Sequence, residues 1–171
     1  FNDLRVNIRK QGVANIKRYY ALFFCLAITT HNVEEALWLP EWSQSASSFQ
    51  QPVTANEFHF AVLIITLLAY VCSFLYVRFH NSKLLKWAFI GFLGSMVFNA
   101  IFPHLLATIV TKTYAPGVVT GLLLNLPINT IILYKLHKLH VITKKEIVIS
   151  TIVVGGVLLA IIPVLFAIGR T

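Results

Sequence analysis

The chain has 171 residues, of which 57% are hydrophobic and only 12% are charged. A soluble domain is typically about one quarter charged and slightly less than half apolar, so this composition excludes an ordinary water-soluble globule. A mean hydropathy of +0.76 also excludes a disordered chain, and a free-standing nucleic-acid binder is not expected despite the formal net charge of +8. The sequence therefore predicts a protein whose solvent and main partner is the lipid bilayer.

Five apolar stretches are each long enough to cross a bilayer as a helix, for which about 20 mostly apolar residues are needed. They cover residues 19–39, 58–77, 84–110, 116–136 and 147–168 and leave only short connections. We therefore predict an all-α fold, a polytopic membrane bundle of about five transmembrane helices. Residues 1–18 form a basic cytoplasmic or interfacial segment, and residues 19–171 form a single transmembrane domain.

The basic residues predict the orientation of this bundle. All Lys and Arg residues except Lys112 and Arg170 precede the first span or lie in the second-to-third and fourth-to-fifth connections. Because cytoplasmic segments carry the excess of Lys and Arg, the N-terminus is expected in the cytoplasm and the C-terminus outside. The expected location is the cell membrane, which is the inner membrane in a bacterium. His80, His137 and His140 belong to the wet cytoplasmic end, and no chemistry is predicted for them.

The first span contains polar side chains that are costly in a membrane, within the string HNVEE at residues 31–35. An ionisable side chain in a spanning helix predicts a functional site. Neighbours three and four apart share a helix face, so His31, Glu34 and Glu35 project to one side and Asn32 points elsewhere. A plainer interpretation is that the acids simply reach water near Trp38. Two like charges in a low dielectric repel each other, and a metal ion or a shared proton relieves that repulsion.

Other spans place polar groups at a similar depth. His59 lies at the outer end of the second span, and His104 lies in the outer half of the third. Pro103 cannot donate a hydrogen bond to the carbonyl of Asn99, which predicts a kink. On an ideal helix Asn99 and His104 are more than a quarter turn apart, so both face one site only if the kink reorients one of them.

The fourth span carries a glycine and asparagine stripe. Gly117, Gly121, Asn125 and Asn129 follow one another every four residues. The glycines allow close helix approach, and the two amides then face the bundle interior. Asn125 and Asn129 are therefore either interhelical hydrogen-bonding groups or, together with Asn99, part of a substrate pocket. The last span, by contrast, is predicted to serve packing only.

Imidazole and carboxylate groups at one depth indicate a metal site, since both are ligands for zinc and iron. The hypothesis is that His31, Glu35 and one or both of His59 and His104 hold a divalent transition metal, either zinc or iron. Glu34 then acts as the catalytic base that activates a water on this metal. The pattern is similar to the HxxEH motif of zinc hydrolases, but its last ligand is Glu35 in place of a histidine.

Three classes of function remain open. The first is a metal-dependent membrane enzyme that acts on a lipid or another hydrophobic substrate, with hydrolysis as the simplest reaction. A metal-free version would use the acids as proton donors for isomerisation or cyclisation. The second is a small transporter of metal, protons or a hydrophobic solute; five spans without an inverted repeat argue against a self-contained transporter unless the chain forms a homodimer. The third is a membrane interaction module without catalysis.

The sequence also resembles the HXXEE membrane proteins, a family named for the motif that His31, Glu34 and Glu35 form here. The resemblance covers most of residues 20–168. It includes HNVEEALWLPEW in the first span, FPHLLAT in the third and TYAPGVVTGLLLNLP in the fourth. The resemblance implies a polytopic bacterial-type membrane protein in which the motif residues matter, and it implies no particular reaction.

Overall fold

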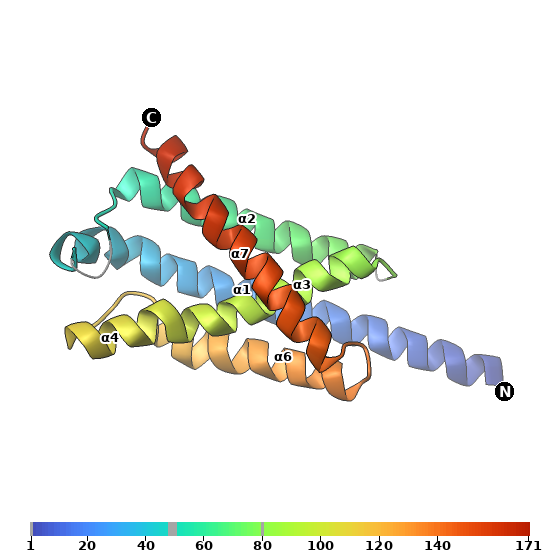
Figure 1. Ribbon diagram of the computed structural model, residues 1–171. Coiled ribbons are helices and arrows are strands. Elements are labelled where there is room, and N and C mark those ends of the chain that lie inside the picture. The colour runs from blue at the N-terminus through green and yellow to red at the C-terminus, as the bar shows by residue number, and fades with distance from the viewer. Residues whose placement is uncertain (1, 48–50, 80) are drawn as a thin grey trace.

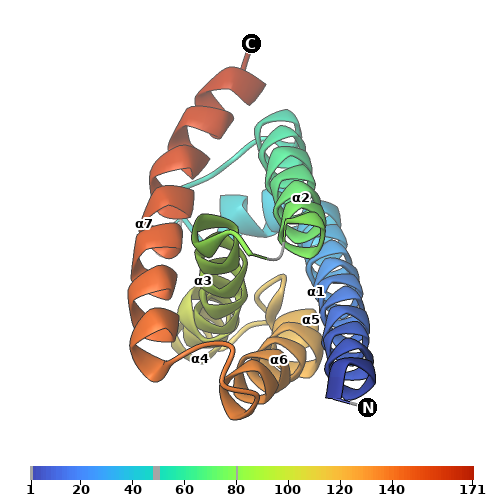
Figure 2. The ribbon, with the colours of Figure 1, turned by 90° about the vertical axis from the view of Figure 1, so that its right-hand side faces the viewer.

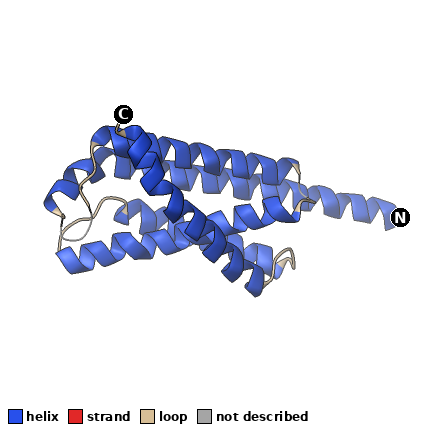
Figure 3. Cartoon of the chain, turned by 45° about the horizontal axis from the view of Figure 1, so that its top comes forward, coloured by secondary structure: helices blue, strands red, loops and turns tan. Residues whose placement is uncertain are grey.

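The structure is a computed structural model that describes residues 2–47, 51–79 and 81–171, with side chains from residue 16 onward. Every regular element in these ranges is a helix (Figure 3), which confirms the predicted all-α class. Four helical segments are long and apolar enough to cross a membrane, namely Ala55–Arg78, Lys83–Thr111, Val118–Lys138 and Lys144–Gly169. They correspond to the second to fifth predicted spans, each longer or shifted by a few residues.

The predicted first span lies inside a much longer helix, α1 (Asn2–Ser45). It is not one of the four apolar segments, because the polar string at residues 31–35 interrupts it. The basic segment predicted for residues 1–18 continues into this span without a break in the helix over the part that is described. The cytoplasmic or interfacial place expected for its first residues depends on side chains outside the described ones, and His80, expected at the wet cytoplasmic end, also lies outside them.

Capping motifs fix the start of two of the long helices. Thr54 accepts a hydrogen bond from the backbone of Glu57, whose carboxylate accepts one from the Thr54 backbone, at the start of α2 (Ala55–Arg78). Thr143 and Glu146 repeat this arrangement at the start of α7 (Lys144–Gly169). Such reciprocal caps satisfy N–H groups that a helix start leaves unpaired.

The other two long segments are both broken. α3 (Lys83–Asn99) passes through a π-helical turn, η1 (Ala100–Leu105), into α4 (Leu106–Thr111), and Phe102 has non-helical φ and ψ of −129° and 113°. The irregular turn predicted next to Pro103 is therefore present. A second π-helical turn, η2 (Gly121–Asn125), joins α5 (Val118–Thr120) to α6 (Leu126–Lys138). Irregular backbone at membrane depth is tolerated where protein covers it, and it often marks a functional site.

The helices pack as a bundle that α7 crosses obliquely, against α3 and α2 (Figures 1 and 2). The two termini lie at opposite ends of the bundle (Figure 1). Gly94 lets α3 approach α7 closely, because a Cβ there would lie 1.8 Å from the Thr151 hydroxyl. The aromatic centre of the core is a stack of Tyr76 on Phe89, with ring centroids 4.4 Å apart, and Phe24 meets Phe89 edge-on at 5.7 Å.

Many large apolar side chains of the long helices lie on the outer surface, including Leu67, Phe74, Leu123, Ile152 and Leu159, each more than half exposed. So many exposed apolar side chains on one small protein are unfavourable in water, whereas lipid tails are as apolar as these side chains. The bundle therefore has the surface of a membrane protein, and several polar side chains of its spans are buried inside it, among them His31, His104 and Asn125.

Candidate metal centre

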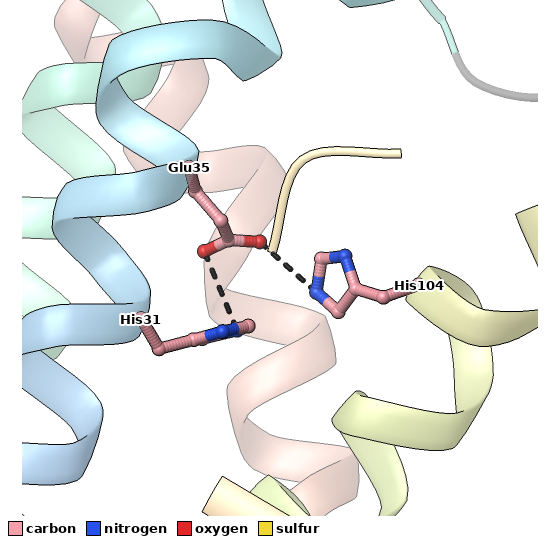
Figure 4. A group of neighbouring side chains, drawn as sticks. All are labelled: His31, Glu35 and His104. Carbon is pink, nitrogen blue, oxygen red and sulfur yellow. Dashed lines mark ion pairs between the residues drawn. The ribbon is translucent and has the colours of Figure 1, made fainter. Parts of the chain in front are cut away.

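Three ligand-type side chains from two chain segments point into one buried space (Figure 4). His31 and Glu35 come from α1, and His104 comes from η1. One Glu35 oxygen lies 3.1 Å from Nε2 of His104, and the other lies 3.8 Å from Nε2 of His31. One ligand atom from each residue lies within 4.8 Å of the others. Ligands at about 2.0–2.2 Å from one zinc ion are about 3–4 Å apart, so this spacing suits a single small ion.

Asn99 connects the two imidazoles. Its Nδ2 lies 3.1 Å from Nε2 of His31 and 3.1 Å from Nε2 of His104. An amide nitrogen carries two hydrogens, so in this orientation it donates to both rings and each Nε2 presents a lone pair. On an ideal helix Asn99 and His104 would face different sides, but the irregular turn of η1 directs both towards the same site. Asn99 lies between the two imidazoles, and its role in a substrate pocket remains a prediction.

This arrangement places two hydrogen-bond acceptors, on His104 and Glu35, next to each other. Nε2 of His104 lies 3.1 Å from a Glu35 carboxylate oxygen, and both atoms carry lone pairs when Asn99 donates to the ring. Two such atoms attract each other only through a proton or a cation between them. The contact is therefore favourable when a proton lies between Nε2 of His104 and the Glu35 oxygen, or when a cation binds both atoms.

The other nitrogen of His31 is held by Thr120. The Thr120 hydroxyl donates its single hydrogen to Glu34, and its oxygen lies 3.0 Å from Nδ1 of His31. The hydroxyl must therefore accept from Nδ1–H, which leaves the lone pair on Nε2. Asn99 requires the same tautomer from the opposite side of the ring. Metal-binding histidines are held in this way by partners on the second nitrogen.

Glu34 has a different environment from the one that the sequence suggests. Its carboxylate accepts hydrogen bonds from backbone N–H groups of Gly117 at 2.9 Å, Thr120 at 2.8 Å and Val119 at 3.4 Å. The hydroxyls of Thr120 and Tyr114 donate to it as well. A carboxylate has about four lone-pair positions, so five donors fill it. Glu34 as catalytic base remains a prediction, and these contacts favour a role in positioning the segment at residues 114–120.

Gly117 shapes the wall behind the two histidines. Its φ of +89° is a backbone conformation that residues with a side chain rarely adopt. A Cβ at this position would lie 2.7 Å from Cε1 of His104 and 2.9 Å from Cε1 of His31. The next glycine of the stripe, Gly121, would place a Cβ 3.6 Å from His31. Glycine at residue 117 is therefore required by the fit of the rings as well as by the turn.

The remaining predicted site residues form no hydrogen bond with this group in the described structure. His59 is exposed on α2, and its Nε2 lies 2.8 Å from the carbonyl oxygen of Ala36. Asn125 and Asn129 are fully buried, but within the described part of the chain their amide groups make no hydrogen bond. Asn32 points away from the site, as predicted, and donates to Thr66 on α2 at 2.7 Å.

The sequence did not predict the roles of Thr120 and Tyr114, whose hydroxyls both donate to Glu34. A threonine inside a span and a tyrosine in a loop are common, so neither carries a signal on its own. The only available signal was their position within TYAPGVVTGLLLNLP, the stretch that also carries the resemblance to the HXXEE family. Their roles depend on contacts with Glu34, which lies more than 75 residues earlier in the chain.

Comparison with known proteins agrees with the motif. Residues 22–132 match a family described as "Protein of unknown function with HXXEE motif". The chain is 60% identical over 151 residues to the "Uncharacterized protein YrkK" of Bacillus subtilis (strain 168), which covers 88% of this chain and 96% of that protein. No solved structure matches the chain. The chain therefore belongs to the HXXEE family, and His31, Glu34 and Glu35 are its motif residues.

Proposed function

We propose that His31, Glu35 and His104 hold a divalent transition metal, zinc or iron, in an integral membrane enzyme that acts on a lipid or another hydrophobic substrate. The observation that carries this proposal is the convergence of three metal-ligating side chains, from two segments of the chain, on one buried space. Two imidazoles and one carboxylate are the ligand set of several zinc hydrolases and of non-haem iron enzymes, which keep further positions open for water or substrate.

Hydrolysis is the reaction that this ligand set supports most directly. A bound zinc ion would polarise a carbonyl or phosphoryl oxygen of the substrate and favour ionisation of water near neutral pH. The chain itself supplies orientation: Thr120 holds Nδ1 of His31 and Glu34 holds Thr120, whereas a bound metal would take the Nε2 lone pair that Asn99 faces. Burial of His31 and His104 keeps bulk water away, which strengthens electrostatic interactions within the site.

The proposed topology places this centre within the membrane. α1 serves as a fifth span, with the N-terminus in the cytoplasm and the C-terminus outside, and the bundle lies in the inner membrane in a bacterium. The termini at opposite ends of the bundle (Figure 1) support an odd number of spans. Reporter fusions test the orientation. A periplasmic alkaline phosphatase joined after Thr171 is expected to be active, and the same fusion after Lys138 inactive; the opposite pattern would overturn it.

Metal analysis of the purified protein tests the centre. We expect about one zinc or iron ion per chain after purification in mild detergent, and loss of that ion in His31→Ala, Glu35→Ala and His104→Ala. His59→Ala is the matched control, because His59 contacts only a backbone carbonyl in the described structure and its removal should leave the metal in place. Absence of stoichiometric metal from a folded wild-type protein would contradict the proposal.

The same variants separate an enzyme from a transporter. Lipid extracts incubated with metal-loaded protein are expected to lose one hydrolysable component, and the three ligand variants are expected to leave it unchanged. Metal flux into proteoliposomes without any change in lipid would instead favour transport.

A further inference from the structure

A pocket of about 410 Å³ opens next to the candidate metal centre. This volume is within the range of about 300–1,000 Å³ that is typical of small-molecule sites. One wall is formed by the last turns of α1, and the other by the loop before α5. The lining residues are Trp38, Glu41, Trp42, Ser45, Tyr114 and Pro116.

The lining combines three aromatic rings with one carboxylate. Indole and phenol faces attract cations, and cages of such rings are a common way to bind quaternary ammonium groups. Glu41 is the only charged residue among the lining residues. Within the described part of the chain it forms no ion pair, whereas Glu57 and Glu146 pair with Arg170 and Lys86. The pocket therefore favours a positively charged group.

The pocket and the metal centre share two segments. Glu35 and Glu41 lie on the same helix, about 9 Å apart along its axis at 1.5 Å per residue. Tyr114 lines the pocket and donates to Glu34, and Pro116 lines it immediately before Gly117, which packs against both imidazoles. Anything bound between Trp38 and Tyr114 thus lies directly beyond the wall of the centre.

This separation matches the layering of a bilayer. The polar region on each side of the hydrocarbon is about 5–8 Å thick, and tryptophans such as Trp38 and Trp42 are enriched at its depth. A lipid with its headgroup against these tryptophans would have its linkage region and first chain carbons one layer deeper, at the level of Glu35.

We propose that this pocket binds the ammonium headgroup of a lipid-like substrate. The proposal rests on the proposed function, because it names the class of substrate that the metal centre would act on. The cation lies against the rings of Trp38, Trp42 and Tyr114, and Glu41 neutralises its charge.

Tryptophan fluorescence tests the pocket directly. Trp87, the third tryptophan, lies elsewhere and donates to Glu146, so Trp87→Phe leaves Trp38 and Trp42 as the reporters. We expect dodecyltrimethylammonium chloride, added to this variant in dodecyl maltoside micelles, to change the emission in a saturable way. Laurate, which has a similar chain and the opposite charge, is expected to produce no saturable change. Equal responses to both would overturn the proposal.

Two further variants and one further probe make the test specific. Glu41→Gln and Trp42→Leu are expected to weaken binding of the cationic amphiphile about tenfold, with unchanged far-ultraviolet circular dichroism. Tetramethylammonium chloride is expected to bind at least tenfold more weakly than the amphiphile; equal affinity would contradict a lipid headgroup as the occupant. Unchanged affinity in Glu41→Gln would contradict the role of the carboxylate.

Failure of this inference can be distinguished from failure of the metal site. His31→Ala is expected to lose the metal and to keep its affinity for dodecyltrimethylammonium. If the wild type contains no metal but binds the amphiphile, the result supports the headgroup pocket and contradicts the proposed metal-dependent enzyme. If the metal is present and the amphiphile does not bind, the headgroup proposal alone is overturned.

Discussion

Glu34 and His31 are joined through a single hydroxyl, that of Thr120, which donates to the carboxylate and accepts from Nδ1 of the imidazole. The first and fourth letters of the string HNVEE are therefore not equivalent partners at one ion. His31 turns its Nε2 towards Glu35 and His104, whereas Glu34 faces the backbone of residues 117–120. One acid of the motif faces the two imidazoles, and the other accepts hydrogen bonds from the segment behind them.

Thr120→Val tests this link. Valine keeps the shape of threonine but neither accepts from Nδ1 of His31 nor donates to Glu34. We expect the affinity for zinc to fall about 10–100-fold, as is typical when a partner of a metal-bound histidine is lost, and Thr120→Ser to recover most of it. Competition with a chromogenic chelator measures both. Wild-type affinity in Thr120→Val would show that the hydroxyl does not orient the ring.

Glu34→Gln distinguishes a positioning residue from a general base. The glutamine NH₂ group would face N–H and O–H donors, so we expect the free energy of unfolding to fall by about 1–3 kcal/mol, together with the metal affinity. A residue that acted only as a base would lose activity while metal content and stability stayed at wild-type values. Thermal unfolding and metal titration of the same preparation tell the two roles apart.

Gly117→Ala is expected to damage both the fold and the centre. Alanine would adopt an unfavourable positive φ and press on both imidazoles, so we expect a loss of at least about 1 kcal/mol of stability and weaker metal binding. Gly156→Ala is the control, because no described atom lies within 4 Å of the position that a Cβ at Gly156 would take. An intact metal site in Gly117→Ala would show that the turn can move away from the histidines.

The buried amides of the fourth span allow a test in the opposite direction. Asn129 makes no hydrogen bond within the described chain, and replacing an unpaired buried polar group by an apolar one of similar size is neutral or stabilising. We therefore expect Asn129→Leu to unfold at the wild-type temperature or above it. A marked loss of stability would instead support the interhelical hydrogen-bonding role that the sequence left open.

The hydrogen bond of Tyr114 to Glu34 is expected to make the stability of the protein depend on pH in the alkaline range. Partial burial, together with its hydrogen bond to Glu34, raises the pKa of the Tyr114 hydroxyl in the folded protein above its ordinary value of about 10. A raised pKa means that its contribution to stability is complete below pH 10 and is lost as pH rises through the folded value. The stability difference between wild type and Tyr114→Phe should thus be constant up to about pH 10 and shrink above it. A difference that grows above pH 10 would contradict this assignment.

The sequence by itself determined the helical membrane class, the approximate spans, the polar face that carries His31 and Glu35, and the break at Pro103. These features depend on local properties, namely runs of apolar residues, helical spacing and the missing N–H of proline. The same local reasoning grouped His59 with His104, since both lie at a similar depth.

Only the tertiary structure decided which polar groups meet. Depth along the bundle says nothing of the direction in which a helix face turns, so it could not separate His104, which joins Glu35, from His59, which contacts the backbone of Ala36. Depth also could not predict that Glu34 would bond to Gly117 and Thr120, while Glu35 faces the two imidazoles. Those roles arise from contacts between segments that packing alone brings together.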